Sequence, residues 1–239
     1  MTKESFSILA SFCGPSRALT LPSFLRLLEE ISIKDVIKAG IPKEKTLNKG
    51  LLWVISRLVI KVNRVPSYDE KVTLETFAFK KVHYLFPRGY IVRDEKGGLL
   101  LECEAIWGLI DEKSRKVIDP NDYKISIRSA KTPLDFSLSD FDFSLSSFEK
   151  VQRIEDRKIR LSEIDLNSHM SNFHYGEWWM DEFKEDVFPR ADTIKIAFFL
   201  ELHEGEEVEI KASSNNATLI GYKKETGDKA FQVETKLKS

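Results

Sequence analysis

The chain has little cysteine, no long apolar run and almost no excess charge of either sign. Its two cysteines, Cys13 and Cys103, belong to no metal-binding or redox motif, so we expect a reduced, cytoplasmic protein without structural disulfides. The apolar runs are too short to cross a bilayer, and the opening residues lack the basic segment and long apolar stretch of a signal peptide. We therefore predict a protein that does not enter the membrane.

The charges nearly cancel, with 37 basic and 38 acidic residues and a net charge of −1. This balance excludes a global field that would attract nucleic acid, so an acidic partner would have to meet a local basic patch. Apolar residue types make up 42% of the 239 residues, which is enough for one large core or two smaller ones.

The first half combines one helical pattern with a series of strand patterns. Apolar side chains recur at helical spacing over residues 21–39, with Thr20 as a candidate N-cap, Pro22 in the first turn, and Gly40 and Pro42 at the end. Apolar runs over residues 53–65, 71–82, 86–94 and 98–111 predict strands, and the turn DEKGG joins the last two. One helix followed by antiparallel strands is typical of an α+β fold.

The second half repeats this pattern in a shortened form. We expect a strand over residues 151–164, a helix over residues 171–188 stopped by Pro189, and strands over 193–202, 206–213, 217–225 and 229–238. Residues 131–148 consist almost wholly of Ser, Asp, Phe and Leu, which indicates a linker, and the regular phenylalanines predict that it lies on an apolar surface. We predict an N-terminal domain over 1–130, a linker over 131–150 and a C-terminal domain over 151–239.

The stretch DLNSH places Asp165, Asn167 and His169 on alternate positions directly before the second predicted helix. In an extended segment, these three side chains would share one face, next to the free N–H groups and positive dipole end of the helix. An imidazole suits proton transfer, an amide can donate to a carbonyl oxygen, and a helix N-terminus can stabilise an oxyanion. These groups suit attack on an activated carbonyl, although spacing alone favours a capping role for Asp and Asn.

This region resembles the acyl-acyl carrier protein thioesterases, the Fat-type family of plants and bacteria. The family pattern D-x-N-x-H-x-N-N-x-x-Y-x-x-W is matched by Asp165, Asn167, His169, Asn172, Tyr175 and Trp178, with Ser171 at the first of the paired asparagines. The first half also resembles the family in its W-x-x-x-R and A-x-W-x-x-x-D segments, and the resemblance spans residues 5–233. It implies a double hotdog fold, in which each half is an antiparallel sheet wrapped around a long helix.

The resemblance further implies a catalytic group of Asp165, Asn167 and His169 with a carboxylate that falls on Glu201. A carboxylate that ends an apolar strand is unusual unless it faces a site, and otherwise marks the exit of the strand to solvent. Many family members carry cysteine at the next position, where this chain has Leu202, so attack by water is favoured over a cysteinyl intermediate. We expect Glu201 or His169 to deprotonate the water, Asn167 to hold the thioester oxygen, and Asp165 to position Asn167 or the helix start.

We expect neither a cofactor nor a metal, because His169, His174 and Glu177 do not follow a zinc-ligand pattern. The first half lacks a D-x-N-x-H motif, so the resemblance implies that it supplies the slot for the acyl chain. The implied substrate and partner is acyl carrier protein bearing a fatty acyl chain, bound by a monomer or a homodimer. Because this carrier is acidic, the candidate docking clusters are basic: Lys80, Lys81 and Arg88; Arg128 and Lys131; Arg157, Lys158 and Arg160.

Three other functions remain open at this point. A hotdog thioesterase acting on coenzyme A esters would use the same chemistry on an acyl chain carried by coenzyme A instead of a carrier protein. A non-catalytic acyl-binding protein would have a degenerate site, against which the intact Asp165, Asn167 and His169 set argues. A dehydratase on the same fold is the third, but its usual His-containing helix pattern is not apparent.

Overall fold

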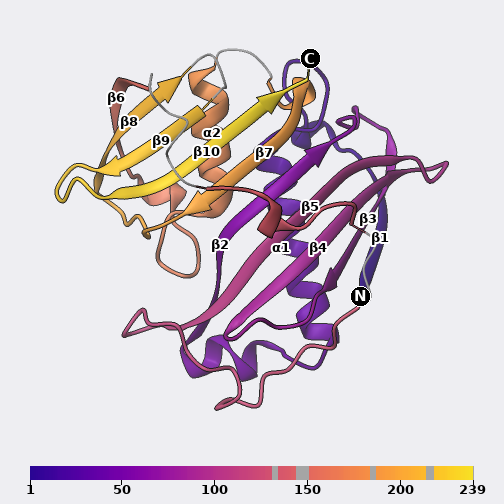
Figure 1. Ribbon diagram of the computed structural model, residues 1–239, viewed down its shortest axis with the longest axis vertical. Coiled ribbons are helices and arrows are strands. Elements are labelled where there is room, and N and C mark those ends of the chain that lie inside the picture. Colours follow the sequence, from indigo (N-terminus) through magenta and orange to yellow (C-terminus); the bar gives the residue numbers. More distant parts are fainter. Residues whose placement is uncertain (131–133, 144–150, 184–186, 214–217, 239) are drawn as a thin grey trace.

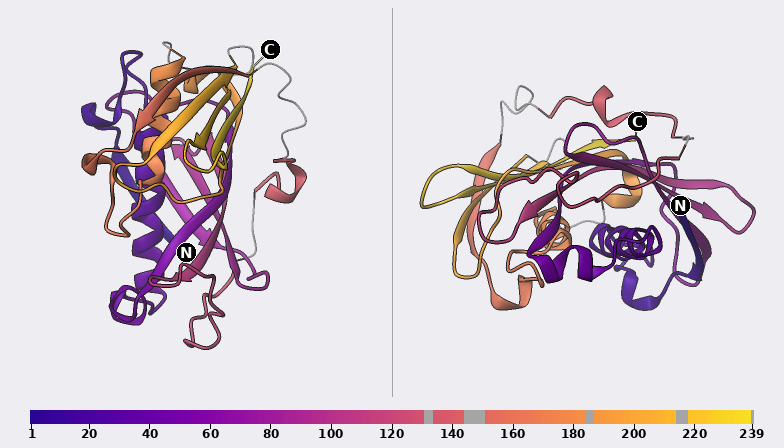
Figure 2. Two further views of the ribbon diagram at one scale, coloured as in Figure 1. Left: turned by 90° about the vertical axis from the view of Figure 1, so that its left-hand side faces the viewer. Right: turned by 90° about the horizontal axis from the view of Figure 1, so that it is seen from below.

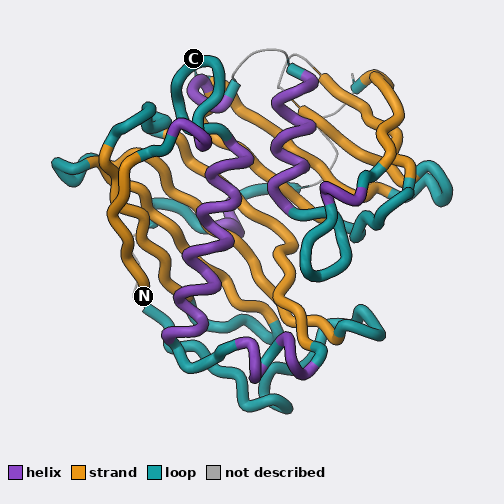
Figure 3. Tube along the Cα trace, turned by 180° about the vertical axis from the view of Figure 1, so that it is seen from behind, coloured by secondary structure: helices purple, strands orange, loops and turns teal. Residues whose placement is uncertain are grey.

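The computed structural model describes residues 1–130, 134–143, 151–183, 187–213 and 218–238. Within them, ten strands form one antiparallel sheet in the order β1-β3-β4-β5-β2-β7-β10-β9-β8-β6 (Figure 1). The two long helices, α1 (Leu21–Lys38) and α2 (Asn172–Glu182), lie on the same face of this sheet (Figure 3). The expected α+β class is confirmed.

The two halves build the sheet in the same way. The first half contributes β1 (Thr2–Ser7), β2 (Leu51–Val62), β3 (Lys71–Ala78), β4 (Leu85–Asp94) and β5 (Leu99–Asp111). The second contributes β6 (Gln152–Lys158), β7 (Ala191–Phe198), β8 (Glu207–Ser213), β9 (Thr218–Lys223) and β10 (Lys229–Leu237). From the junction outwards the order is β2-β5-β4-β3-β1 on one side and β7-β10-β9-β8-β6 on the other, so each half repeats the other.

Helix α1 forms where the sequence predicts it. The Thr20 hydroxyl accepts a hydrogen bond from the backbone N–H of Ser23 at 3.3 Å, which caps the helix start. Its apolar stripe is buried against the sheet: Leu21, Phe24, Leu25, Leu28 and Ile31. Helix α2 is shorter than expected and ends at Glu182, where Asp181 and Glu182 set two carboxylates against the negative end of the helix dipole. Residues 184–186, inside the expected helix, lie outside the described residues.

One hydrophobic core crosses the junction between the halves. Strands β2 and β7 pair in register, with Ile60 opposite Ile194, and both side chains are fully buried. The rings of Phe24 on α1 and of Phe188, just before β7, stack 6.1 Å apart, so α1 of the first half also packs on the second half. Each half therefore completes the core of the other.

The described part of the expected linker, residues 134–143, lies on the face of the sheet opposite the helices (Figure 2). Leu138 and Phe143 pack on Val59 of β2 and Ala197 of β7, which is the apolar surface that the phenylalanine spacing predicts. The backbone N–H of Leu138 donates to the buried carboxylate of Glu104 at 2.7 Å. Residues 131–133 and 144–150 lie outside the described residues.

Among the described residues, no helix has both the length and the apolar character needed to cross a membrane.

Candidate active site

The stretch from Asp165 to His169 is a tight turn, and the expectation of an extended segment is wrong. Ile164 and Met170 pair as an antiparallel bridge, so the chain must reverse between them. The backbone N–H of Asp165 donates to the carbonyl of His169, and that of Ser168 to the carbonyl of Asp165, both at 3.0 Å. Ser168 takes the left-handed conformation that such a turn requires, with φ of 63°. Chain reversal therefore brings Asp165 to His169 and to the backbone N–H of Asn167, which the alternating pattern did not reveal.

Asp165 and His169 hold the shape of this 165–169 turn. One carboxylate oxygen of Asp165 accepts from the backbone N–H of Asn167 at 2.7 Å, and the other lies 3.7 Å from Nδ1 of His169. The same Nδ1 lies 3.1 Å from the carbonyl oxygen of Met170, which can only accept, so Nδ1 carries the proton. The Nε2 atom of His169 is buried and has no hydrogen-bond partner among the described residues.

Asn167 borders a largely apolar cavity of about 200 Å³, which we call the α1 cavity. Its walls come from α1, the loop after α1, and strands β2, β4 and β5, including Val36, Trp53, Phe86 and Trp107. Among the described residues of the second half, Leu166 and Asn167 alone reach this cavity. The amide of the 165–169 turn thus meets an apolar slot that belongs to the other half of the chain.

Glu29 on α1 also lines the α1 cavity, although it belongs to no motif that the sequence offers. Burial, followed by the negative charges of Asp165 and Glu30, raises the pKa of the Glu29 carboxyl to about 7. The described residues offer its carboxylate neither a hydrogen bond nor an ion pair. One signal was present in the sequence, because Glu29 stands four residues after Leu25 and so interrupts the apolar stripe of the helix.

Glu201 is tied to the first half of the chain. Its two carboxylate oxygens accept from Nε and Nη2 of Arg115, at 2.8 and 2.5 Å. The segment that carries Glu201 lies beside the 165–169 turn, since the backbone N–H of Met170 donates to the carbonyl of Leu202 at 2.7 Å. The structure therefore brings the backbones of both segments together, while the Glu201 carboxylate is bound to Arg115. No local sequence signal pointed to Arg115, because its partner is remote in the chain.

Tyr175 is buried and feels the negative charges of two carboxylates of the candidate site. Burial raises the pKa of its hydroxyl, and the negative charges of Glu201 and Asp165 raise it further. Its ring packs edge-to-face on Phe198 and Phe231, with centroids 5.1 and 4.7 Å away. Tyr175 thus stays neutral and anchors the start of α2 on β7 and β10.

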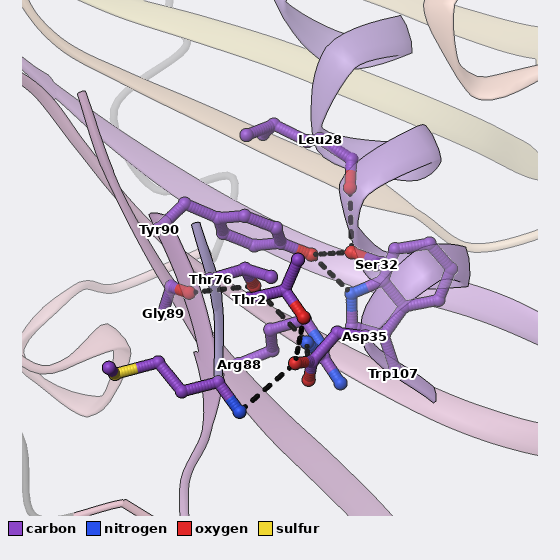
Figure 4. Close-up of polar contacts among 10 residues, drawn as sticks. Thr2, Leu28, Ser32, Asp35, Thr76, Arg88, Gly89, Tyr90 and Trp107 are labelled. Atoms are coloured by element: carbon purple, nitrogen blue, oxygen red, sulfur yellow. Dashed lines mark hydrogen bonds and ion pairs between the residues drawn. The ribbon is translucent and has the colours of Figure 1, made fainter. Parts of the chain in front are cut away.

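Arg88 is not a docking residue, and its assignment to a basic surface cluster is wrong. It is buried and pairs with Asp35 of α1 at 2.7 Å, and it also donates to Thr76 (Figure 4). Beside it, the hydroxyl of Tyr90 lies 2.7 Å from that of Ser32 and accepts from the indole N–H of Trp107 at 3.0 Å. Arg88, Ser32 and Trp107 also line the α1 cavity, so two neighbouring hydrogen-bonded groups contribute polar side chains to its walls.

The other basic candidates differ in exposure. Lys80, Arg128, Lys158 and Arg160 are exposed, Lys81 and Arg157 are half-buried, and Lys131 lies outside the described residues.

His174 and Glu177 form a link between the helices. Nδ1 of His174 lies 2.6 Å from Glu177, whose other oxygen accepts from Arg26 of α1 at 2.8 Å. Within the described residues, no three His, Cys, Asp or Glu side chains gather as a metal-binding group.

Two protein-family models match the chain. The acyl-ACP thioesterase N-terminal domain matches residues 1–125, and the acyl-ACP thioesterase C-terminal domain matches residues 147–238. A chloroplastic acyl-[acyl-carrier-protein] hydrolase of Cuphea viscosissima is 22% identical over 205 residues, which cover 81% of this chain and 50% of that protein. The chain thus spans about half the length of the curated relatives it matches.

Two solved bacterial structures share the fold. An acyl-ACP thioesterase from Bacteroides thetaiotaomicron aligns with a TM-score of 0.77 and 18% identity, covering 99% of this chain and 97% of that one. A putative oleoyl thioesterase from Lactobacillus plantarum aligns with a TM-score of 0.76 and 20% identity, covering 98% and 94%. The expected double hotdog fold is confirmed.

Proposed function

The chain belongs to the acyl-ACP thioesterase family, and on that premise we propose that it hydrolyses fatty acyl-acyl carrier protein, releasing a free fatty acid and the carrier. The observation that carries this proposal is the meeting of Asn167 with the α1 cavity. A thioester lying there would have its carbonyl oxygen at an amide donor and its alkyl chain in an apolar slot. Each methylene buried in such a slot contributes about 0.8 kcal/mol, so the depth of the cavity would select chain length.

The four predicted residues take complementary roles in this proposal. Asn167 donates to the thioester oxygen, and Asp165 fixes the backbone of Asn167 through the hydrogen bond at 2.7 Å. His169 holds the shape of the turn through Nδ1, which lies 3.1 Å from the carbonyl oxygen of Met170, and Glu201 is oriented by Arg115. Water attacks directly, because Leu202 supplies no nucleophile at the position after Glu201.

The proposed division of labour follows the two halves. Residues 1–130 form the domain that binds the acyl chain, residues 131–150 form the linker, and residues 151–239 form the domain that carries the D-x-N-x-H motif. We place the protein in the cytoplasm, as a monomer or a homodimer with acyl carrier protein as its macromolecular partner.

A panel of substrates tests the proposal. Acyl chains of graded length would be presented on acyl carrier protein and on coenzyme A, and the released thiol and free fatty acid would be quantified for each. We expect hydrolysis of the carrier-linked esters with a maximum at one chain length. Faster hydrolysis of the coenzyme A esters would identify a coenzyme A thioesterase instead, and binding without hydrolysis would identify an acyl-binding protein.

A substitution ties the activity to the 165–169 turn. Replacing Asn167 with Ala removes the amide donor, and the loss of one such donor typically costs about 10²–10³-fold in kcat. The matched control is Asn63→Ala, because Asn63 is an exposed residue that follows β2 and lies outside the α1 cavity. Equal activity of the two variants would contradict the role of Asn167.

A further inference from the structure

The two groups first expected to deprotonate water are both held away from the α1 cavity. His169 is 7% exposed, and its Nε2 atom is sealed from solvent. Both oxygens of Glu201 accept hydrogen bonds from Arg115, so this carboxylate is turned toward the guanidinium of Arg115. Neither residue lines the α1 cavity, where Asn167 would hold the thioester.

Glu29 differs from both residues because it lines the α1 cavity and because its carboxylate is not bound by another side chain among the described residues. It projects from α1 into the wall of the α1 cavity that also contains Asn167. The helix that carries it is fixed by the buried side chains of Leu25 and Leu28, so the Glu29 side chain starts from a fixed backbone at the cavity wall. Its oxygens have no hydrogen bond or ion pair to the described residues, and they are therefore free to bind a water.

We propose that Glu29 is the general base of the hydrolysis, acting from the first half of the chain on a thioester held by Asn167 of the second half. The inference rests on the proposed function and assigns a catalytic residue within it. It also makes the site a joint product of both halves, because the base and the amide come from different hotdog units.

The chemical step balances without any further reactant. The Glu29 carboxylate takes a proton from water while the water oxygen bonds to the thioester carbon, and Asn167 donates to the developing oxyanion. The intermediate then collapses, the carbon–sulfur bond breaks, and the protonated Glu29 returns its proton to the leaving thiolate. One water is consumed, and a carboxylic acid and a thiol are formed.

The charges around Glu29 suit this role. Asp165 faces it from the 165–169 turn and Glu30 neighbours it on α1, and both disfavour a second negative charge. The cationic residues of the cavity wall are Lys43 and Arg88, and Arg88 is committed to Asp35. With burial added, the pKa of Glu29 is raised to about 7, and a base is most effective when its pKa lies near the working pH.

The test compares Glu29→Gln with Glu30→Gln, the same change one residue along the helix at an exposed position. On an acyl-carrier substrate, we expect Glu29→Gln to lower kcat by about 10²–10⁴-fold with little change in KM. The acid limb of the pH profile of kcat/KM, near pH 7, should disappear in this variant. Glu30→Gln should retain an acid limb, displaced to lower pH because one of the charges that raise the pKa of Glu29 is removed.

A second variant separates loss of the base from loss of structure. Glu29→Asp keeps a carboxyl in the cavity, so we expect a lower rate with the acid limb retained, and circular dichroism and Tm should match those of the unaltered protein for all three variants. A Glu29→Gln protein that keeps kcat within a few-fold and retains the acid limb would overturn the proposal. If the unaltered protein hydrolysed no acyl thioester, the proposed function would fail and this role with it, whereas an active Glu29→Gln beside an inactive Asn167→Ala would reject only the role of Glu29.

Discussion

At the scale of single residues, the pair between Glu201 and Arg115 shows how a contact of little stability can matter for activity. Both side chains are more than a quarter exposed, and an ion pair in that setting contributes about 0–1 kcal/mol to folding. Its two parallel hydrogen bonds nevertheless fix the direction of the Glu201 carboxylate beside the 165–169 turn. Arg115 is therefore a positioning residue in our interpretation.

Replacing Arg115 with Met should separate activity from stability. We expect hydrolysis to fall by up to about 10²-fold, because the Glu201 segment pairs with the 165–169 turn and its release would displace the Asn167 amide, and a small misplacement of a reacting group has effects of that size. The Tm should change by no more than about 2–4 °C, the shift that accompanies roughly 1 kcal/mol in a chain of this length. The control is Arg153→Met, which breaks an exposed pair with Asp156 on β6. A variant at position 115 with full activity would contradict the positioning role.

The buried pair of Asp35 and Arg88 predicts a specific acid sensitivity. Burial by itself raises the pKa of Asp35, but hydrogen bonds and charge from Arg88, with a hydrogen bond from Thr2, lower it below its ordinary value. A carboxyl whose folded-state pKa is depressed stabilises the fold above its unfolded pKa, and this stability is lost as the pH falls through the folded-state value.

Asp35→Asn should therefore lower the free energy of unfolding most near neutral pH. Breaking one partner of a buried pair costs about 3–5 kcal/mol, because it leaves the charge of Arg88 uncompensated. Urea unfolding at a series of pH values measures the difference in unfolding free energy between the variant and the unaltered protein. We expect the full difference above about pH 4 and a smaller difference as the pH falls further. A difference that stayed constant across the series would show that the charge of Asp35 does not carry the effect.

The residues of the candidate site divide by how far away their partners lie. Asp165, Asn167 and His169 could be found from the sequence because they stand together in one short motif. Their arrangement could not, because it depends on the pairing of Ile164 with Met170, and alternation alone does not distinguish a strand from a turn. Glu29 and Arg115 were missed because each meets its functional neighbours only through the fold. Arg88 was wrongly predicted to be a surface residue. A basic residue in a strand is usually exposed, and its buried partner Asp35 is distant in the sequence.

At the scale of elements, strand β9 supports α2 through a glycine. A Cβ atom at Gly221 would lie 2.1 Å from Cε1 of Phe231 on the neighbouring strand β10. The Phe231 ring is fully buried and packs edge-to-face on Tyr175 of α2. Because Gly221 has no side chain, the ring of Phe231 can occupy the space directly over it.

Gly221→Ala should consequently disturb both stability and the site. The ring of Phe231, which packs on Tyr175, has to move, and overpacking of this kind costs about 1–3 kcal/mol. We expect a lower Tm together with lower activity, measured on the same preparation. Gly108→Ala in β5 is the matched control, because the added atom meets only Leu85 at an ordinary 3.6 Å. Equal melting temperatures for the two variants would contradict the argument.

The elements themselves were largely readable from local patterns. Helix α1 begins at its cap and buries its stripe as expected, and each expected strand has its counterpart in the sheet. Helix α2 was drawn too long because its apolar periodicity continues past Glu182, whereas the acidic last turn disfavours continuation. Periodicity therefore located the helix better than it located its end.

At the scale of the whole molecule, the order of the strands lay beyond local pattern. Strand β2 pairs with β5 of its own half and with β7 of the other half, and nothing in its apolar alternation specifies the second partner. The repeat of the two halves was visible in the sequence, but the seam that joins them, which is the pairing of β2 with β7, was not. That seam matters for function, because it sets Asn167 of one half against the α1 cavity of the other.

A shared sheet and core predict that the two halves unfold together. Tryptophan supplies a probe for each half, since Trp53 and Trp107 lie in the first, and Trp178 and Trp179 in the second. When either pair is replaced with phenylalanine, the remaining tryptophan fluorescence comes from the other half only. In urea, each variant should show one fluorescence transition that coincides with the loss of its own circular dichroism.

A change at the seam should then shift both probes equally. Ile194→Ala removes a fully buried side chain of β7 opposite Ile60 of β2, at an expected cost of about 2–5 kcal/mol. Placed in each tryptophan background, it should lower the unfolding free energy reported by the two halves by the same amount, because a cooperative unit has one free energy of unfolding. If only the second-half probe responded, the halves would be independent domains in contact, and a catalytic site shared between them would lose its structural basis.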